Sequence, residues 1–353
     1  MTGVASSSIS SLAERVLRGE RRALAQAISR LEEGGEAGRE LLALLYPHGG
    51  RAHTIGVTGA PGTGKSTLVS AMARGYRRRG LTVGIVAVDP SSPFTGGALL
   101  GDRVRMRDLS GDPGVFIRSM ATRGALGGLA RTAGDVVLAL DAAGYERIFI
   151  ETVGAGQDEV EVATLAHTVV IVEAPGLGDE VQVLKAGLLE TGHILVVNKA
   201  DHDGAEQTVA ALQAMLDLAG GTPAVVDHHG VRMSARAPAD DRAGDGWRPP
   251  VLATIATEGR GVEEVLDAIE AHRARSASVA DLGRRLAEAQ LARALDEALR
   301  RLLAEHLDPA AYDEAVQAVL NRSVDPYTAA ARLVSGLRPG AVPGGGRAPL
   351  CNS

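Results

Sequence analysis

The chain has 353 residues, of which 45% are hydrophobic and 23% are charged, and its formal net charge is −6 at pH 7. A chain of this length and apolar content can bury the core of one α/β domain of roughly 200 residues and still carry appendages. The acidic balance argues against a nucleic-acid partner, because a phosphate backbone requires a basic face.

Cys351, in a Gly/Pro-rich tail, is the single cysteine of the chain. An internal disulfide is therefore excluded. No apolar run approaches the ~20 residues of a membrane span. The first residues, Met-Thr-Gly-Val-Ala-Ser-Ser-Ser, lack the apolar core of a secretory signal. We therefore expect a cytoplasmic protein without a membrane partner.

The amino-terminal segment has a helical pattern. Residues 10–46 are expected to form two helices that break at Gly34-Gly35. Their leucines recur on one apolar face, at Leu12, Leu24, Leu31, Leu41, Leu42 and Leu45. This pattern predicts a helical extension, residues 1–50, that packs on the domain that follows.

A glycine-rich loop lies between a short apolar strand, His53–Thr58, and a stretch in which Leu68, Met72 and Tyr76 recur at helical spacing. This context is typical of a phosphate-binding loop, or P-loop. Its backbone amides would surround a β-phosphate, Lys65 would bridge β- and γ-oxygens, and the Ser66 hydroxyl would bind Mg²⁺. The predicted nucleotide-binding residues here are Gly59, Ala60, Pro61, Gly62, Thr63, Gly64, Lys65, Ser66 and Thr67.

A Gly- and Asp-rich loop follows the predicted strand Thr82–Val88. It contains Asp89-Pro90-Ser91-Ser92, then Thr95-Gly96-Gly97, then Gly101-Asp102-Arg103-Val104-Arg105. With few apolar anchors, it suits a segment that is ordered by Mg²⁺ and phosphate and released after hydrolysis. A plain surface loop is the alternative.

Another predicted strand, Arg147–Ile150, follows the helix-like stretch Asp135–Ala143 and leads into Glu151-Thr152-Val153-Gly154. A carboxylate at the carboxyl end of a strand can hold Mg²⁺ or its waters, and Gly154 lets a backbone N–H approach the γ-phosphate.

The residue after Gly154 is Ala155, where small regulatory GTPases have the glutamine that orients the attacking water; the first glutamine here is Gln157. We therefore expect slow intrinsic hydrolysis that a partner or another loop accelerates. Arg105 and Lys185 are candidates for that role, and both could equally be solvated surface cations.

The tetrapeptide Asn198-Lys199-Ala200-Asp201 directly follows an apolar strand, His193–Val197. The Asp201 carboxylate can accept from both the N1–H and the exocyclic amino group of guanine, whereas adenine presents an acceptor at N1. GTP is therefore favoured over ATP. The alternative is a simple helix N-cap at Asp201 or Asp203.

Residues 51–275 alternate strands and helices, which predicts an α/β domain with a mainly parallel sheet and nucleotide at the carboxyl ends of its strands. Three helices are expected after it, over Asp281–Leu307, Ala310–Leu320 and Pro326–Leu337. The apolar content of this arm, residues 276–338, exceeds what an isolated arm can hide, notably at Leu282, Leu286, Leu295, Leu299, Leu302 and Leu303.

The apolar content of this arm predicts a dimer contact, with an arm folded back on its own domain as the alternative. Residues 339–353 are expected to form a disordered tail.

From about residue 10 to about residue 338, the chain resembles the MeaB-type G-protein chaperones of adenosylcobalamin-dependent acyl-CoA mutases, a family also known historically as arginine/ornithine transport ATPases. The resemblance rests on strings longer than generic GTPase motifs: Val88-Asp89-Pro90-Ser91-Ser92, Thr95-Gly96-Gly97, Gly101-Asp102-Arg103, Thr122-Arg123-Gly124, Leu126-Gly127-Gly128, Glu151-Thr152-Val153-Gly154-Ala155-Gly156-Gln157 and Pro175-Gly176-Leu177-Gly178-Asp179-Glu180-Val181-Gln182.

This resemblance implies a P-loop GTPase fold of the SIMIBI type with a C-terminal dimerisation arm. It also implies a third switch over Pro175–Lys185 that reports nucleotide state to the mutase. The residues it implies for signalling are Gln157, Asp179, Glu180, Gln182 and Lys185.

The resemblance further implies that the carboxylates of Asp89, Asp102 and Glu151 belong to the magnesium site and that Arg105 is a switch arginine linked to hydrolysis. The base-side loop would be Ile255-Ala256-Thr257, after the strand Val251–Thr254. It departs from the family's commoner Ser-Ala pair, but the Ala256 backbone N–H can still supply the contact to the guanine carbonyl.

Together these patterns predict a Mg²⁺-dependent, homodimeric GTPase that binds GTP and GDP. The resemblance implies that it gates cofactor loading or protection of a cobalamin-dependent acyl-CoA mutase, with methylmalonyl-CoA mutase as the first candidate. A P-loop ATPase or kinase linked to amino-acid transport would not need Asn198 to Asp201. A metallochaperone GTPase would need Cys or His clusters near the switches, and the neighbouring pair His228-His229 does not form one.

Overall fold

The structure, a computed structural model, describes residues 2–90, 109, 111–122, 128–152, 165–176, 191–219, 247–275 and 279–336. The chain divides into two compact units, Met1–Gly283 and Arg284–Ser353.

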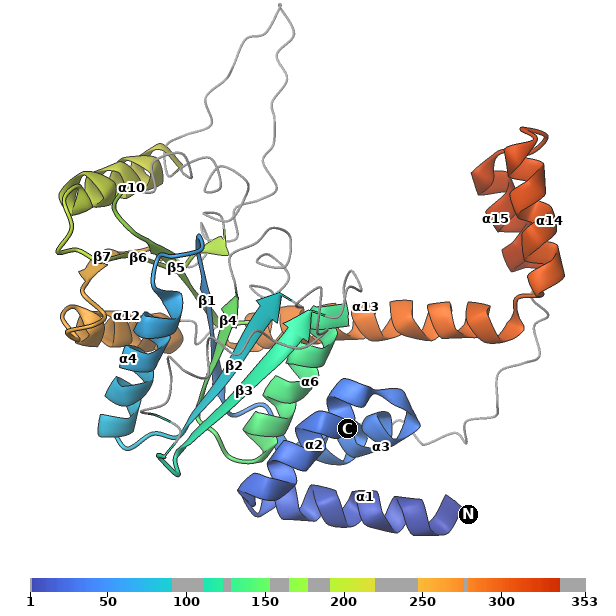
Figure 1. Cartoon of the computed structure of the whole chain (residues 1–353), viewed down its shortest axis with the longest axis horizontal. Coiled ribbons are helices and arrows are strands. Elements are labelled where there is room, and N and C mark those ends of the chain that lie inside the picture. The colour runs from blue at the N-terminus through green and yellow to red at the C-terminus, as the bar shows by residue number, and fades with distance from the viewer. Residues whose placement is uncertain are drawn as a thin grey trace, which may run out of the picture. The chain divides into compact units, whose positions relative to one another are not determined.

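A seven-stranded sheet forms the centre of the first unit (Figure 1). The strand order is β3-β2-β4-β1-β5-β6-β7, and each neighbouring pair is parallel. Both faces are covered by helices, which is why strands such as β5 are almost continuous apolar runs. The predicted α/β fold with a parallel sheet is confirmed. The strands are β1 His53–Thr58, β2 Val83–Pro90, β3 Val115–Thr122, β4 Arg147–Thr152, β5 Thr168–Glu173, β6 Ile194–Asn198 and β7 Val251–Thr254.

Helices α4 (Lys65–Arg78) and α12 (Val262–Arg275) pack on one face of the sheet, and α6 (Gly128–Ala142) packs on the other (Figure 1). Helix α10 (Ala205–Ala219) joins β5 and β6 in a third apolar cluster. Since side chains alternate along a strand, successive residues of β4 point to opposite faces. Phe149 accordingly lies in the cluster with α4, whereas Ile148 and Ile150 lie in the cluster with α6.

The amino-terminal segment forms three helices, α1 (Thr2–Leu17), α2 (Arg21–Glu33) and α3 (Gly35–Leu45), followed by the 3₁₀ helix η1 (Tyr46–His48). The expectation of two helices was wrong, because the chain also breaks at Gly19. That glycine has a φ of 76°, a conformation that costs glycine little. Of the predicted apolar face, Leu24, Leu31, Leu41 and Leu45 are buried in the cluster that includes α6.

A buried carboxylate fixes the start of β1, the strand that leads to the glycine-rich loop. Asp141, at the end of α6, accepts hydrogen bonds from the backbone N–H of Gly50 at 2.5 Å and of Ala52 at 3.0 Å. These bonds satisfy amides that would otherwise be buried without partners. The helical segment and β1 are therefore joined through α6.

An ion pair connects helix α12 to β4. The Arg147 guanidinium donates to both carboxylate oxygens of Glu270, each at 2.9 Å. Burial would raise the pKa of Glu270, but the hydrogen bonds and charge of Arg147, together with hydrogen bonds from Tyr76 and Arg273, outweigh it and lower that pKa. Bidentate arginine–carboxylate pairs of this kind are among the stronger charge-assisted hydrogen bonds.

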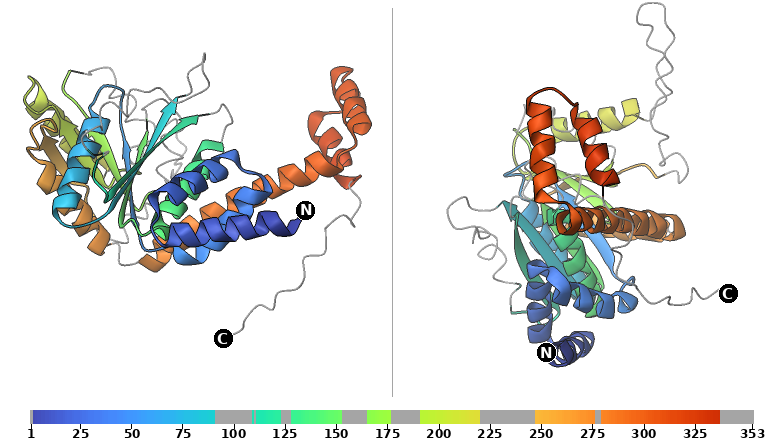
Figure 2. Two further views of the ribbon diagram at one scale, coloured as in Figure 1. Left: turned by 60° about the horizontal axis from the view of Figure 1, so that its bottom comes forward. Right: turned by 90° about the vertical axis from the view of Figure 1, so that its right-hand side faces the viewer.

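The carboxyl-terminal part is helical, as the sequence predicts. Helix α13 (Val279–His306) crosses the boundary between the two units and is followed by α14 (Pro309–Leu320) and α15 (Pro326–Ser335), which Figure 2 shows as a pair. The side chain of Asp308 caps α14, that of Asp325 caps α15, and a proline occupies the first turn of each. Within the described ranges, no helix is both long and apolar enough to cross a membrane.

Candidate nucleotide-binding site

The loop Gly59–Gly64 connects β1 to α4 at the carboxyl end of the strand. Three glycines in it have positive φ angles: Gly59 at 140°, Gly62 at 84° and Gly64 at 92°. A Cβ atom on Gly59 would lie 2.0 Å from the Val172 carbonyl oxygen, and one on Gly64 would lie 2.4 Å from Nδ2 of Asn198. Both positions therefore require glycine, as expected for a loop whose backbone closely approaches its neighbours.

Lys65 places a positive charge inside this loop. Its side chain is buried, and Nζ donates to the carbonyls of Gly59 at 2.6 Å and Ala60 at 2.8 Å. The Thr63 hydroxyl donates to the same Ala60 carbonyl at 3.0 Å. The loop ends at the amino terminus of α4, where the helix dipole adds positive potential. This combination is suited to bind phosphate groups.

Ser66 and Glu151 form a hydrogen-bonded pair next to this loop. The Ser66 Oγ donates to Oε1 of Glu151 at 2.5 Å, and both residues are buried. Glu151 lies near the end of β4, where it pairs in register with Val57 of β1. A hydroxyl and a carboxylate are hard oxygen donors of the kind that Mg²⁺ prefers, so this pair fits the predicted ion.

Two further carboxylates were predicted for the same ion. The backbone of Asp89 belongs to β2, which pairs with β4, but its side chain is outside the described part of the structure, and so is all of Asp102. Among the residues that are described, no group of three or more His, Cys, Asp or Glu could hold a metal ion.

Asn198 joins the base-side loops to the phosphate-binding loop. This side chain is buried, and its Nδ2 donates to the Thr63 carbonyl at 2.9 Å. Its Oδ1 accepts from the Thr254 hydroxyl and from the Ala256 backbone N–H, both at 3.1 Å. The Ala256 backbone N–H, which was expected to donate to the guanine carbonyl, therefore donates to Asn198 in this structure. Thr254 was not identified from the sequence as part of the site.

The next residues along the chain face the same region. Lys199 has a φ of 58°, and its Nζ donates to the Gly62 carbonyl at 2.7 Å. Asp201 lies in the turn that follows, with 47% of its side chain exposed. Helix α10 begins at Ala205, so an N-cap would fall next to that residue and not at Asp201. This position leaves the Asp201 carboxylate accessible to a ligand.

The loop after β7 is short and closed. The Ile255 N–H donates to the Arg260 carbonyl at 3.0 Å, and Ile255 and Ala256 are buried while Thr257 is exposed. A Cβ atom on Gly261 would lie 2.1 Å from the Ala253 carbonyl oxygen, so glycine is needed where the loop turns back.

The structure thus brings together predicted site residues from the ends of β1, β4, β6 and β7. The other predicted site residues lie outside the described ranges, and their roles stay predictions; they are Asp102, Arg105, Gly154, Gln157, Asp179, Glu180, Gln182 and Lys185.

A histidine cluster lies at the opposite, amino end of the sheet. The Thr168 hydroxyl lies 2.8 Å from Nε2 of His53 and 2.8 Å from Nδ1 of His272. The His167 ring stacks on His53 with a centroid distance of 5.3 Å, and its Nδ1 accepts from the Thr54 N–H at 3.0 Å. Burial lowers the pKa of His53 to about 2, and neighbouring histidines and arginines act in the same direction. The sequence pattern did not reveal this cluster.

A parallel sheet with a phosphate-binding loop after β1, a Ser–carboxylate pair beside it and Asn-Lys-x-Asp after β6 defines the P-loop GTPase class. The chain belongs to the family described as methylmalonyl Co-A mutase-associated GTPase MeaB, which matches residues 21–310. It is a GTPase, and the resemblance drawn from its motifs is confirmed.

Individual relatives agree with this assignment. A protein of Pyrococcus abyssi that is named as a GTPase is 49% identical over 265 residues, covering 75% of this chain and 76% of its own length. The mitochondrial methylmalonic aciduria type A homolog of Mus musculus is 33% identical over 269 residues, covering 71% of this chain and 60% of its own. The crystal structure of a protein described as LAO/AO transport system kinase has a TM-score of 0.65 at 28% identity, covering 93% of this chain and 97% of that one.

Proposed function

We propose that this GTPase is a nucleotide-dependent chaperone of a cobalamin-dependent acyl-CoA mutase, with methylmalonyl-CoA mutase as the first candidate. The observation that carries the proposal is the family match over residues 21–310, because the family is described as associated with that mutase. In this role the nucleotide state gates loading of the cobalamin cofactor or its protection in the mutase.

The nucleotides are proposed to be GTP and GDP, read by the half-exposed Asp201 carboxylate. Lys199 and Asn198 bond to the carbonyls of Gly62 and Thr63, so the base-side loop and the phosphate-binding loop are held at a set distance. A ligand that spans the two would need a base and a phosphate at that spacing. The Asp201 carboxylate supports guanine as that base, because it can accept from both N1–H and the exocyclic amino group.

Mg²⁺ is proposed as the cofactor; when bound, it neutralises negative charge that builds up on the phosphates during transfer. Ser66 and Glu151 would hold it, together with Asp89 and Asp102. The Lys65 ammonium, inside the phosphate-binding loop, would stabilise charge on the β- and γ-oxygens.

Because Ala155 follows Gly154, we propose that the isolated protein hydrolyses GTP slowly. Arg105 and Lys185 are proposed to assist the reaction, and the signalling residues already named would pass the nucleotide state to the mutase.

A homodimer is proposed through the carboxyl-terminal arm. Helix α13 exposes leucines at helical spacing, Leu291 at 69%, Leu295 at 57% and Leu299 at 51%, and α14 exposes Tyr312 and Leu320. Exposed apolar side chains in this number suit contact with a second copy of the chain.

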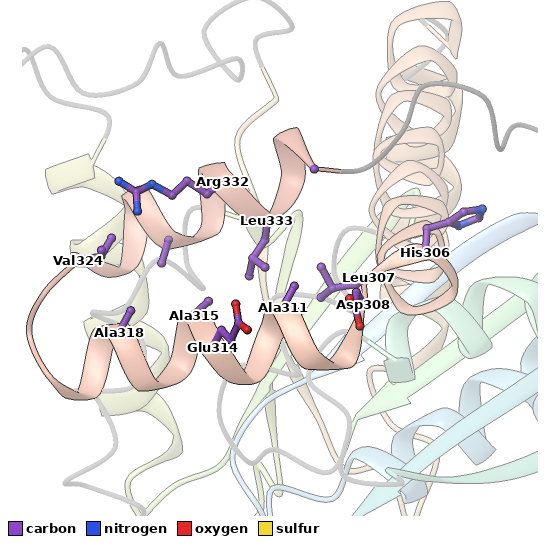
Figure 3. Close-up of a pocket in the computed structure, with 12 residues that line it drawn as sticks. His306, Leu307, Asp308, Ala311, Glu314, Ala315, Ala318, Val324, Arg332 and Leu333 are labelled. Atoms are coloured by element: carbon purple, nitrogen blue, oxygen red, sulfur yellow. The ribbon is translucent and has the colours of Figure 1, made fainter.

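The second unit also contains a groove between α14 and α15 (Figure 3). Ala311 and Ala315 of α14 face Leu333 of α15 across it, and Glu314 and Arg332 also line it. Most of the residues that line the groove are apolar, so we propose a role for it in protein contact. The organisation we propose is an extension over residues 1–50, a GTPase domain over 51–275, the arm over 276–338 and a tail over 339–353, in a cytoplasmic protein.

The chaperone proposal is tested by gel filtration of the purified chain with methylmalonyl-CoA mutase in GDP and in a non-hydrolysable GTP analogue. A complex that forms in at least one nucleotide state is expected, and Asp179→Ala should weaken it. If neither this mutase nor any other cobalamin-dependent acyl-CoA mutase of the same cell binds in either state, the chaperone proposal fails while the GTPase assignment stands.

The structural relative described as a transport system kinase raises a second candidate function, phosphate transfer from ATP. Asn198 to Asp201 argue against it, because they form a guanine reader. Comparable calorimetric affinities for ADP and GDP would favour the kinase instead.

A further inference from the structure

Two successive residues at the end of β4 contact the two sides of the phosphate-binding loop. Glu151 accepts from Ser66, just after the loop, at 2.5 Å. Thr152 donates through its hydroxyl to the hydroxyl of Thr58, just before the loop, at 3.1 Å. Since side chains alternate along a strand, the two contacts lie on opposite faces of the sheet.

The hydrogen bond between these two hydroxyls lies where the backbone pairing of β1 with β4 ends. Val57 and Glu151 are the final residue pair in register between β1 and β4, and Thr58 is next paired with Ile171 of β5. The Thr58–Thr152 bond therefore continues the connection between β1 and β4 by one residue, at the point where β1 turns into the loop.

Both threonines are buried, each with 3% of its surface exposed, and the neighbouring positions on the same face of β4, Ile148 and Ile150, are apolar. Valine has nearly the same shape and would pack there without a polar atom. A buried hydroxyl costs free energy unless it is hydrogen-bonded, so each threonine depends on the other. Packing alone does not require this pair.

We propose that Thr152 is a positioning residue for GTP hydrolysis. Through its bond to Thr58 it holds the end of β4 against the start of the phosphate-binding loop, and thereby sets the Glu151 carboxylate at its distance from Ser66. This inference rests on the proposed roles of Glu151 and Ser66 in the site.

The test compares Thr152→Val, which removes the hydroxyl, with Thr152→Ser, which keeps it. In Thr152→Val, kcat should fall by at least about fivefold, while GDP affinity measured by fluorescence in EDTA stays within about twofold. Thr152→Ser should keep kcat within about twofold of the wild type. Thr58→Val removes the same bond from the other side and should lower kcat similarly, and the double variant should lose no more than either single one.

Thr168→Val is the matched control, because it removes a buried hydroxyl from the amino end of β5, far from the loop. It should lower the melting temperature while leaving kcat within about twofold. If Thr152→Val does not fold, Thr58→Val tests instead whether the hydrogen bond between the two threonines supports kcat.

Three results would overturn the proposal: an unchanged kcat in Thr152→Val and Thr58→Val, an equal loss in Thr152→Ser, or an equal loss in Thr168→Val. Glu151→Gln and Ser66→Ala separate this failure from a failure of the site itself. If both of those variants turn over GTP normally, the proposed site is wrong. If they are inactive while Thr152→Val is normal, the positioning role alone is wrong.

Discussion

The Lys199 ammonium donates to the Gly62 carbonyl at 2.7 Å, so the loop after β6 holds the phosphate-binding loop after β1 directly. Beside it, Nδ2 of Asn198 bonds to the Thr63 carbonyl. Two residues of the Asn198–Asp201 motif thus bond to the phosphate-binding loop, and Asp201 is the residue of this motif that we propose to read the base. The proposed base-binding loop and the phosphate-binding loop are therefore joined by two direct hydrogen bonds.

Replacement of Asn198 by alanine tests this arrangement. The substitution leaves the Thr254 hydroxyl, the Ala256 N–H and the Thr63 carbonyl without their partner inside a buried region. We expect the free energy of unfolding to fall by about 2–3 kcal/mol and GDP affinity to fall at least about tenfold. Urea unfolding and calorimetry measure the two effects.

Lys199→Met is the control, because its bond lies at the surface and should contribute less than about 1 kcal/mol to folding. Equal stability of Asn198→Ala and the wild type would contradict the structural role of Asn198.

Replacement of Asp201 by asparagine tests the choice of base. The wild type should bind GDP at least about 100-fold more tightly than ADP, because adenine offers the carboxylate no pair of donors. In Asp201→Asn the preference should shift from guanine toward xanthine nucleotides, since the amide can donate to the xanthine carbonyl. Titration calorimetry with GDP, XDP and ADP gives the answer, and an unchanged preference would remove Asp201 from base recognition.

Much of the core domain could be predicted because its signals are local. The strand before the phosphate loop, the glycines of the loop and the helix after it follow from consecutive residues, and β7 has the expected bounds, Val251–Thr254. The break at Gly19 was missed, because one glycine between two apolar helical patterns is a weak signal.

The hydrogen bonds inside the site could not be predicted in the same way. Asn198 meets Thr254 only because β6 and β7 are neighbours in the sheet, and Thr58 meets Thr152 only because β1 lies beside β4. Such contacts depend on strand order and register, which a threonine in an apolar run does not reveal.

Loss of the phosphate-binding groups tests the catalytic proposal. Lys65→Ala and Ser66→Ala should each abolish measurable GTP turnover while the far-UV circular dichroism spectrum stays that of the wild type, since their proposed role is to act on phosphate and metal. Phosphate release and circular dichroism are measured on the same preparations. A loss of helical signal in either variant would mean that the residue has a structural role instead.

The histidine cluster predicts a loss of stability in mild acid. Because burial lowers the pKa of His53 from its ordinary value of 6.5 to about 2, the unfolded chain takes up the proton first. Stability that is complete above pH 6.5 is therefore lost as the pH falls, by about 1.4 kcal/mol for this residue between pH 7.5 and 5.5. His53→Gln should reduce the pH dependence of the unfolding free energy by that amount. The same pH dependence in His53→Gln and the wild type would contradict this assignment.

Phosphate release from GTP, measured with and without methylmalonyl-CoA mutase from the same organism, tests whether this GTPase serves the mutase. We predict slow hydrolysis by the isolated protein and an acceleration of at least about tenfold by the mutase, equivalent to about 1.4 kcal/mol of barrier. Asp179→Ala and Lys185→Ala should reduce the stimulated rate much more than the basal rate. A rate that neither this mutase nor any other cobalamin-dependent acyl-CoA mutase of the cell changes would rule out the chaperone role.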